Sequence, residues 1–310
     1  MTDRHKTAFA TPLGSYQFKR CPFGAKNSCA EFQRGMNRIL FTGLYKKCAV
    51  NVDDIIVFGK TKEEHNANLE WVLAQCELNN VKIKFEKCVS FQREVKYLGL
   101  AVSESCIKPL ADKMESLKAS NAPRNKTEMR SMIGRLNFYA RFRNNYSSKL
   151  KPFRALLQKT KDFQWTEQHQ KAFELVLSDL QGYTSLVFAP KDERKIIELH
   201  MTDTSIEALL LREKGQLMSR ASKLLGQAES NYSSVEKEML ALVLALDKFE
   251  PFLDPSHFTI TVPTNALERC PKLVHKPERI ESQLLRIPER FYKLHFETTN
   301  LQFAKISQSI

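Results

Sequence analysis

The sequence predicts an α+β protein with several domains. With 310 residues, 42% of them hydrophobic and 27% charged, the chain is large enough to bury cores in roughly one to three domains. The residue pattern changes twice along the chain. Short strands mixed with helices are predicted over residues 1–105, mostly helices over 106–189, and a βββαβα order over 190–310.

The first region combines helical periodicity with short β-prone runs. Thr61 can cap a helix whose first turn contains Glu63 and Glu64, where the helix dipole favours acids. The predicted elements are a helix over 28–43, strands over 48–52 and 55–58, a helix over 61–79, and strands over 81–85 and 95–102.

The middle region is helical and basic. Apolar residues from Met129 to Tyr139 recur at helical spacing. Residues 108–161 hold 14 Lys/Arg and 3 Asp/Glu, so most of the chain's net charge of +13 is concentrated here. Clustered cations suit nucleic-acid phosphates, and the alternative is an ordinary solvated helix face. The residues predicted to contact phosphate are Lys126, Arg130, Arg135, Arg141 and Arg143.

The last region returns to a mixed pattern typical of a sheet with helices on its faces. Pro190 is the predicted boundary. The predicted elements are strands over 195–201, 206–212 and 216–222, a helix over 233–252, a strand over 257–262 and a helix over 280–290.

Composition argues against several classes of protein. The longest uncharged apolar run, Met239–Leu246, is far shorter than a membrane span requires, so no membrane partner is expected. Residues 1–6 are polar, unlike a signal peptide, which favours an intracellular location in nucleus or cytoplasm. The seven cysteines show no CxxC spacing or zinc pattern and are interpreted as reduced structural thiols.

One acidic pair, Asp53 and Asp54, separates two apolar runs. Carboxylates at a hairpin tip can hold a divalent metal, and the alternative is an ordinary turn between strands. The surrounding motifs decide between these, because they resemble the palm of gypsy-type LTR-retrotransposon reverse transcriptases. The matching segments are Lys6–Phe9, Pro22–Asn27, Phe32–Arg34, Val52–Phe58, Glu86–Cys88, Val95–Gly99 and Ile133–Tyr139.

This resemblance implies a reverse-transcriptase palm with its fingers largely missing, a helical thumb and connection, and an RNase H-like α/β domain. The family's polymerase holds two metal ions with three carboxylates, of which Asp53 and Asp54 match two. The third belongs to a strand expected before Lys6, where the chain offers no match. The pair alone is expected to bind Mg²⁺ weakly, and no cofactor is expected to be required.

The last region resembles the family's RNase H domain through Ser219–Leu225, Ala228–Ser233 and Glu236–Ala241. Of four acids implied by the resemblance, only Glu238 is retained. Ungapped alignment places His200, Pro263 and Ala304 at the other three positions, and a shifted alignment would place Asp203 at the first.

We therefore expect a truncated, catalytically degenerate member of this family, retained as a domesticated protein or decaying. The favoured function is binding of RNA or RNA–DNA hybrid. The alternatives are a protein-interaction scaffold or inactive subunit, and residual polymerase or ribonuclease H activity completed in trans. Phe138 and Tyr139 either stack on bases or belong to the core.

Overall fold

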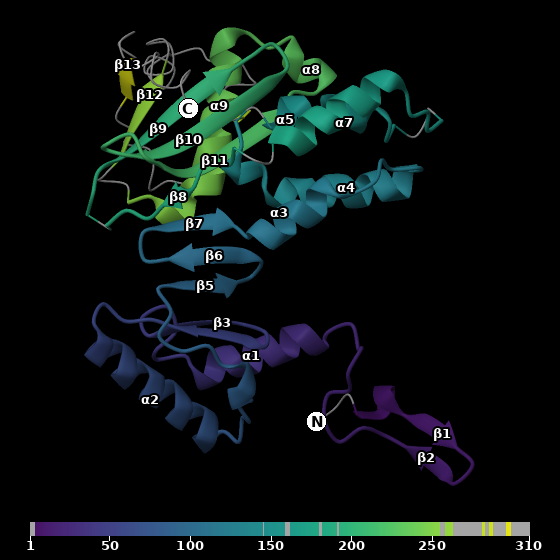
Figure 1. Ribbon diagram of the computed structural model, residues 1–310, viewed down its shortest axis with the longest axis vertical. Helices are drawn as coiled ribbons and strands as arrows, with labels where there is room; N and C mark the ends of the chain where they lie inside the picture. The colour runs from purple at the N-terminus through teal and green to yellow at the C-terminus, as the bar shows by residue number, and fades with distance from the viewer. Residues whose placement is uncertain are drawn as a thin grey trace. The chain divides into compact units, whose positions relative to one another are not determined.

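The computed structural model describes residues 4–144, 146–158, 162–179, 182–190, 192–254, 258–262, 281–282, 285–287 and, for the backbone, 296–298. The chain forms two compact units, Met1–Gln92 and Arg93–Ile310. The expected domain limit at residue 105 falls inside a four-stranded sheet of the second unit. Figure 1 labels the elements of both units.

In the first unit, two helices pack on a short hairpin. The core contains Met36, Leu40, Val50 and Val72 together with Cys48 and Cys76, and burial raises the pKa of both thiols. The elements are η1 (Arg4–Thr7), β1 (Phe9–Thr11), β2 (Gly14–Tyr16), α1 (Ser28–Ile39), β3 (Cys48–Asn51), β4 (Asp54–Val57), α2 (Lys62–Leu78) and η2 (Phe85–Lys87).

The sequence predicts the start of α2 correctly and one strand of this unit incorrectly. Thr61 does cap α2, because its hydroxyl accepts a hydrogen bond from the Glu64 N–H at 3.2 Å. The strand predicted over 81–85 is wrong. Val81 and Ile83 are half-buried against the core, as the alternation indicates, but the segment pairs with no strand among the described residues.

The second unit begins with an antiparallel sheet of order β5-β6-β7-β8. A single strand was predicted over 95–102, but Leu98 and Gly99 both take positive φ, 50° and 78°, and turn the chain back as a two-residue hairpin. These strands are β5 (Glu94–Tyr97), β6 (Leu100–Ser103), β7 (Cys106–Pro109) and β8 (Leu186–Val187).

A helical segment runs between β7 and β8. Its buried face carries Met129, Met132, Ile133 and Leu136 of α4, at the predicted helical spacing. The helices are α3 (Ala111–Lys118), α4 (Lys126–Phe138), η3 (Ala140–Phe142), α5 (Tyr146–Lys149), α6 (Lys151–Ala155) and α7 (Glu167–Asp179).

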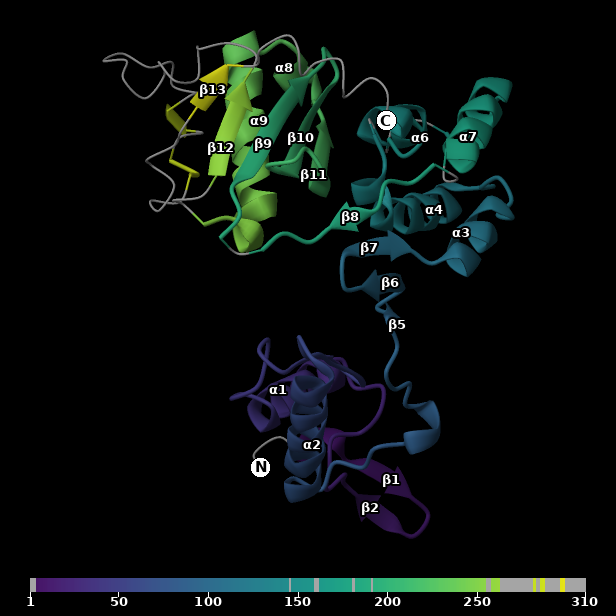
Figure 2. The same cartoon turned by 60° about the vertical axis from the view of Figure 1, so that its left-hand side comes forward.

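The remaining elements form a mixed sheet of order β11-β10-β9-β12-β13, in which β12 runs parallel to β9 and β13 while β9, β10 and β11 are antiparallel (Figure 2). They are β9 (Lys195–Met201), β10 (Ser205–Arg212), β11 (Leu217–Leu224), α8 (Gln227–Ser230), α9 (Ser234–Phe249), η4 (Glu250–Phe252), β12 (Phe258–Val262) and β13 (Phe296–Thr298). The helix predicted over 280–290 lies mostly outside the described residues.

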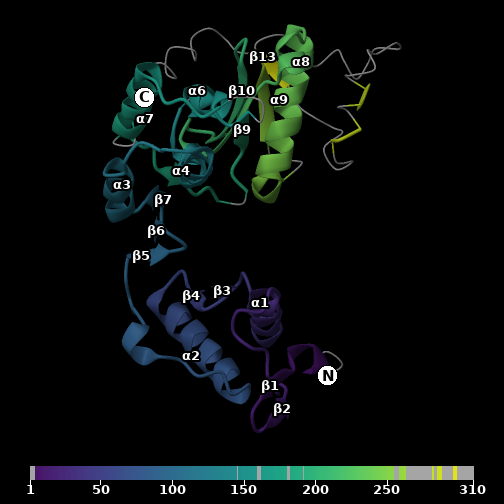
Figure 3. The ribbon, with the colours of Figure 1, turned by 90° about the vertical axis from the view of Figure 1, so that its right-hand side faces the viewer.

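The two faces of this sheet are covered by different layers. Ile206, Ala208 and Leu210 of β10 face α9, whereas Leu209 and Leu211 face the helical segment. Figure 3 shows the strands between α9 on one side and the helical segment on the other. The helical segment and the mixed sheet therefore share a core. In the described part of the chain, no helix is long and apolar enough to cross a bilayer.

Candidate functional sites

Asp53 and Asp54 lie at the tip of the β3–β4 hairpin, where the sequence places them. The strand register leaves Val52 and Asp53 as the two loop residues. Val52 has a φ of 51°, a left-handed conformation that β-branched residues rarely adopt. Gln33 of α1 stabilises it: Gln33 Oε1 accepts from the Val52 N–H at 2.5 Å, and its Nε2 donates to the Val50 carbonyl at 3.1 Å.

The donor set at this turn does not match a two-metal centre. Both carboxylates are exposed, and such a centre needs further acidic ligands that bridge the ions. Within the described ranges, no group of three or more His, Cys, Asp or Glu side chains could hold a metal ion. Two Mg²⁺ ions therefore do not fit this pair, and weak Mg²⁺ binding by Asp53 and Asp54 stays a prediction.

The residues of the expected RNase H site occupy different environments. His200 is exposed on β9, with its Nε2 3.5 Å from a carboxylate oxygen of Glu198. Glu238 is buried on α9. Asp203 lies exposed in the turn between β9 and β10. The other two expected positions, Pro263 and Ala304, lie outside the described residues.

Three of the five predicted phosphate-contacting residues face solvent, two of them on helix α4 and one on η3. Arg130, Arg135 and Arg141 are exposed, and the Arg141 guanidinium lies 6.0 Å from the Phe138 ring centre. Lys126 is half-buried, and its ammonium donates to the Gln158 carbonyl at 2.9 Å. The exposed part of the predicted cationic surface is therefore carried by the three arginines.

On the helical wheel of α4, Arg130 and Arg135 flank opposite edges of the exposed face, and Arg141 follows the helix in η3. Between these edges lie the small residues Thr127, Ser131 and Gly134, followed by Phe138. A Cβ added at Gly134 would meet no atom within 4 Å, so the centre of this face is open. We call this surface, from Thr127 to Arg141, the α4 face.

The structure corrects the prediction for Arg143. Its side chain is only 4% exposed, and its Nη2 lies 3.3 Å from an Asp179 carboxylate oxygen. Asp179 also accepts from Lys149 at 2.6 Å. Burial lowers the pKa of Arg143, which the Asp179 charge opposes. This guanidinium connects η3 and α7 inside the protein and does not reach a phosphate backbone.

A second buried arginine was not anticipated from the sequence. Arg220 of β11 lies 3.6 Å from a Glu207 carboxylate oxygen on β10, with side chains 7% and 11% exposed. Both lie on the sheet face that packs against the helical segment, where Ser147 and Ser222 also hydrogen-bond at 2.7 Å. Burial lowers the pKa of Arg220. Glu207 shares the face of Leu209 and Leu211 by the two-residue period of a strand, and that spacing is the sequence signal for its inward position.

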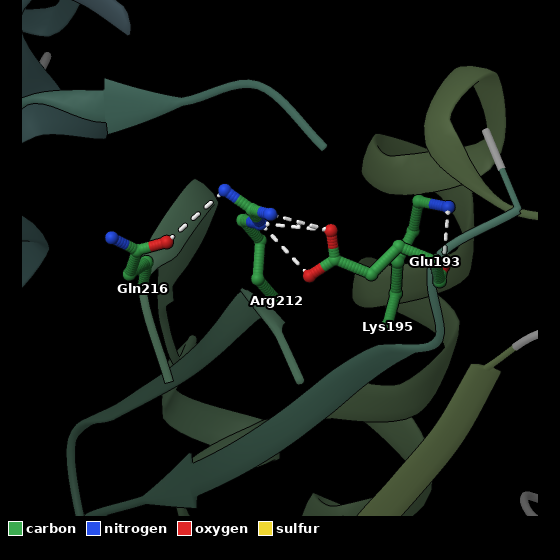
Figure 4. A network of polar contacts seen from close by, with 4 residues as sticks. All are labelled: Glu193, Lys195, Arg212 and Gln216. Atoms are coloured by element: carbon green, nitrogen blue, oxygen red, sulfur yellow. Dashed lines mark hydrogen bonds and ion pairs between the residues drawn. The ribbon is translucent and has the colours of Figure 1, made fainter. Parts of the chain in front are cut away.

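A third arginine joins the chain before β9 to the end of β10. Arg212 Nε donates to Glu193 at 2.8 Å and its Nη2 donates to the same carboxylate at 2.6 Å, while Nη1 reaches Gln216 (Figure 4). Lys195 donates to the Glu193 carbonyl at 3.0 Å. The hydrogen bonds from Arg212 hold the pKa of Glu193 below its usual range.

Comparisons with known proteins agree with this architecture. Residues 2–102 match the family "Reverse transcriptase (RNA-dependent DNA polymerase)", and residues 165–260 match "RNase H-like domain found in reverse transcriptase". The chain is 32% identical over 298 residues to the retrovirus-related Pol polyprotein from transposon 297 of Drosophila melanogaster, covering 94% of this chain and 28% of that protein. It is 30% identical to the Pol polyprotein from transposon gypsy of the same fly, over 81% of this chain and 25% of that protein.

Solved structures share the fold. The foamy viral protease-reverse transcriptase in complex with RNA/DNA hybrid superimposes with a TM-score of 0.79 at 21% identity, over 95% of this chain and 41% of that one. The same viral protein in complex with double-stranded DNA gives a TM-score of 0.79 at 22% identity, over 97% of this chain and 64% of that one. The chain thus spans about a quarter of the two retrotransposon relatives and between two fifths and two thirds of these two structures.

Proposed function

We propose that this chain, which carries reverse transcriptase and RNase H-like domains and is homologous to Drosophila retrotransposon Pol polyproteins, binds RNA or RNA–DNA hybrid without catalysing polymerisation or hydrolysis. The α4 face carries the proposal. It combines two exposed arginines of α4 and Arg141 of η3 with an open row of small residues on a helix whose opposite side is buried core.

The geometry of the α4 face suits a double helix. Arginines on both edges contact phosphates of two strands, and the small residues between them let the helix backbone approach the groove. Arg130 and Arg135 are separated by roughly 7.5 Å along the helix axis, at about 1.5 Å per residue. The solved relatives bound to RNA/DNA hybrid and to double-stranded DNA support this ligand class.

The catalytic half of the proposal rests on residue identity. Asp53 and Asp54 lack further acids around them in the described part, and the aligned first position of the RNase H site is His200. Incubating the pure protein with RNA–DNA hybrid and Mg²⁺ or Mn²⁺ should give no cleavage and no primer extension. Cleavage that is lost in Asp203→Asn or Glu238→Gln would overturn this half and assign those acids.

The binding half is tested by fluorescence anisotropy with a labelled RNA–DNA hybrid across a salt series. Arg135→Glu/Arg141→Glu should abolish binding, and Arg135→Gln/Arg141→Gln should reduce the salt slope by about 2. The control is Lys214→Glu/Lys248→Glu, which changes the net charge equally at exposed positions on other elements. Equal losses in both charge-reversal variants would mean that only net charge matters, and would remove the α4 face as the site.

Gly134→Leu tests groove approach separately from charge. The substitution fills the open centre of the α4 face and favours the helix, so the protein should keep its stability while its affinity for hybrid falls at least tenfold. Unchanged affinity would show that the nucleic acid does not contact this row.

A second candidate function, a protein-interaction scaffold, is favoured by the exposed aromatic residues of the first unit. Phe41 and Tyr45 are 76% and 78% exposed beside the hairpin β3–β4. A pull-down from the native source should retain a partner with the wild type and lose it with Phe41→Ser/Tyr45→Ser. Retention by both would exclude these two residues as the contact.

A further inference from the structure

A cluster of buried polar groups lies where η3 and α5 pack on β11 (Figure 1). Arg143 follows η3, Tyr146 begins α5, and Arg220 belongs to β11. Tyr146 is 1% exposed, and the side chains of Arg143 and Arg220 are 4% and 7% exposed. The hydrogen bond of 2.7 Å between Ser147 and Ser222 joins α5 to β11 beside this cluster.

Five polar atoms of the cluster make no hydrogen bond within the described residues: Nε and Nη2 of Arg143, Nε and Nη1 of Arg220, and the Tyr146 hydroxyl. The carboxylates that pair with the arginines do not satisfy these atoms. Asp179 lies 3.3 Å from Arg143 Nη2 without hydrogen-bonding geometry, and Glu207 lies 3.6 Å from Arg220 Nε, which is too far. An unsatisfied buried donor destabilises a fold, and a charged one does so more strongly, so this cluster needs a further acceptor.

The chemistry of the five atoms defines that acceptor. A guanidinium has N–H donors and no acceptor. Burial raises the pKa of the Tyr146 phenol, so its hydroxyl keeps its proton and can donate as well. A cation therefore does not fit, whereas an anion or the oxygen of a water molecule does.

The charges of the cluster favour an anion over water. Arg143 and Lys149 share the Asp179 carboxylate, and Arg220 has Glu207, so three cations face two carboxylates and one positive charge remains. The charge of Arg143 also acts on Arg220 and helps to lower its pKa, so the two guanidiniums repel each other. An anion between them offsets this repulsion, and a neutral water molecule does not.

We propose that Arg143, Tyr146 and Arg220 form an internal binding site for one chloride ion. The single excess positive charge matches a monovalent ion, whereas a phosphate dianion would leave the cluster negative. A monatomic ion accepts hydrogen bonds from any direction, as donors on two packed elements require. The ion would stabilise the packing of the helical segment on the mixed sheet. This goes beyond the proposed function, which concerns the exposed α4 face.

Urea denaturation of the full chain across a chloride series tests the site. A ligand that binds only the folded state raises the urea midpoint as its concentration increases. Sodium gluconate keeps the ionic strength constant, because its anion is too large for an enclosed site. The wild-type midpoint should rise with chloride. Tyr146→Phe removes one donor and keeps the ring, so it should need about ten- to 150-fold more chloride for the same rise.

Two double variants separate this site from the surface. Glu207→Leu/Arg220→Met removes the guanidinium together with its carboxylate, and its midpoint should not respond specifically to chloride. The matched control is Arg135→Gln/Arg141→Gln, which removes two exposed arginines and should keep the wild-type response. Loss of the response in this control would assign the effect to surface charge and overturn the proposal.

Bromide locates the ion directly. In crystals of the protein grown with bromide, an anomalous peak should lie within hydrogen-bonding distance of Arg143, Tyr146 and Arg220. A water molecule at that position and no bromide would overturn the proposal. So would a wild-type midpoint that is the same in chloride and gluconate, or a Tyr146→Phe variant with the wild-type chloride response.

Discussion

Arg141 and Arg143 are two residues apart and have opposite surroundings. Arg141 is exposed over the Phe138 ring, whereas Arg143 is 4% exposed and pairs with Asp179. Both belong to the same basic stretch of the sequence. The concentration of charge between residues 108 and 161 is therefore the sum of a solvent-facing surface and a structural interior, and only the first can attract a polyanion.

The interior arginines mark where the helical segment meets the mixed sheet. Arg143 comes from the helical side and Arg220 from β11, and the positive charge of Arg143 contributes to lowering the pKa of Arg220. Moving a guanidinium out of water is expensive unless a carboxylate accompanies it. Glu207 accompanies Arg220, and Asp179 accompanies Arg143. Breaking these pairs should lower the stability of the fold, whereas replacing an exposed arginine should lower the affinity for a ligand.

The largest effect is expected for Glu207→Ala. The substitution leaves the Arg220 guanidinium buried without its carboxylate, which should cost roughly 3–5 kcal/mol of unfolding free energy. Urea denaturation measures the loss, and hybrid binding at low denaturant should be retained.

A double variant sharpens this result. Glu207→Leu/Arg220→Met removes both charges together and should restore stability to near the wild-type value. If the double variant is as unstable as Glu207→Ala, the pair serves through its shape or through other contacts of Glu207, not through charge compensation.

Asn125→Ala separates the folding of α4 from the surface it carries. The Asn125 side chain accepts from the Glu128 N–H at 2.9 Å and caps the helix, so its loss should cost about 1 kcal/mol. Thermal unfolding should shift downward while the salt slope of hybrid binding stays constant. A reduced slope at full folding would mean that the cap is needed to position the arginines of the α4 face against phosphate.

Phe138→Leu tests whether the Phe138 ring orients the exposed Arg141 side chain. The ring orients Arg141 by a cation–π contact of about 0.5–1 kcal/mol, so affinity for hybrid should fall about two- to fivefold. Comparison with Arg141→Gln is decisive: a larger loss for Phe138→Leu than for Arg141→Gln would mean that the ring contacts the nucleic acid itself.

The smallest effect concerns Arg212, which is neither fully exposed nor buried. Its hydrogen bonds lower the pKa of Glu193, so the ion pair contributes stability above the ordinary Glu pKa and loses it as pH falls through the lowered value. The stability difference between wild type and Arg212→Gln should therefore shrink in acid, measured as urea midpoints against pH. A difference that grows in acid would show that Glu193 is not the partner that matters.

Much of the fold follows from local pattern. The bounds of β9 are those that alternation predicts, and Thr61 caps its helix as expected. These features depend on neighbours in sequence. The extended segment over 81–85 and the turn at Leu98–Gly99 were missed because pairing partners and left-handed conformations are decided by tertiary structure.

The candidate sites divide in the same way. The position of Asp53 and Asp54 in a hairpin follows from two flanking β-prone runs. The hydrogen bond that Gln33 accepts from the Val52 N–H depends instead on the packing of α1. Arg143 follows η3 in extended backbone and is buried against Asp179, which lies far along the chain, so its burial depends on tertiary structure. Of the two candidate stacking residues, Tyr139 belongs to the core and Phe138 is 38% exposed.

The short pairing of β7 with β8 has a consequence for how the second unit assembles. It joins Ile107 to Leu186, 79 positions apart, through two residue pairs only. Closing a chain loop of that length costs about 4 kcal/mol in conformational entropy, which is more than the hydrogen bonds of two residue pairs contribute to stability. The strands can therefore meet only after the intervening helices have collapsed on their own core. In folding kinetics, a probe on β8 should therefore change later than a probe on α4. The pairing of β7 with β8 forms at the end of assembly and does not nucleate it.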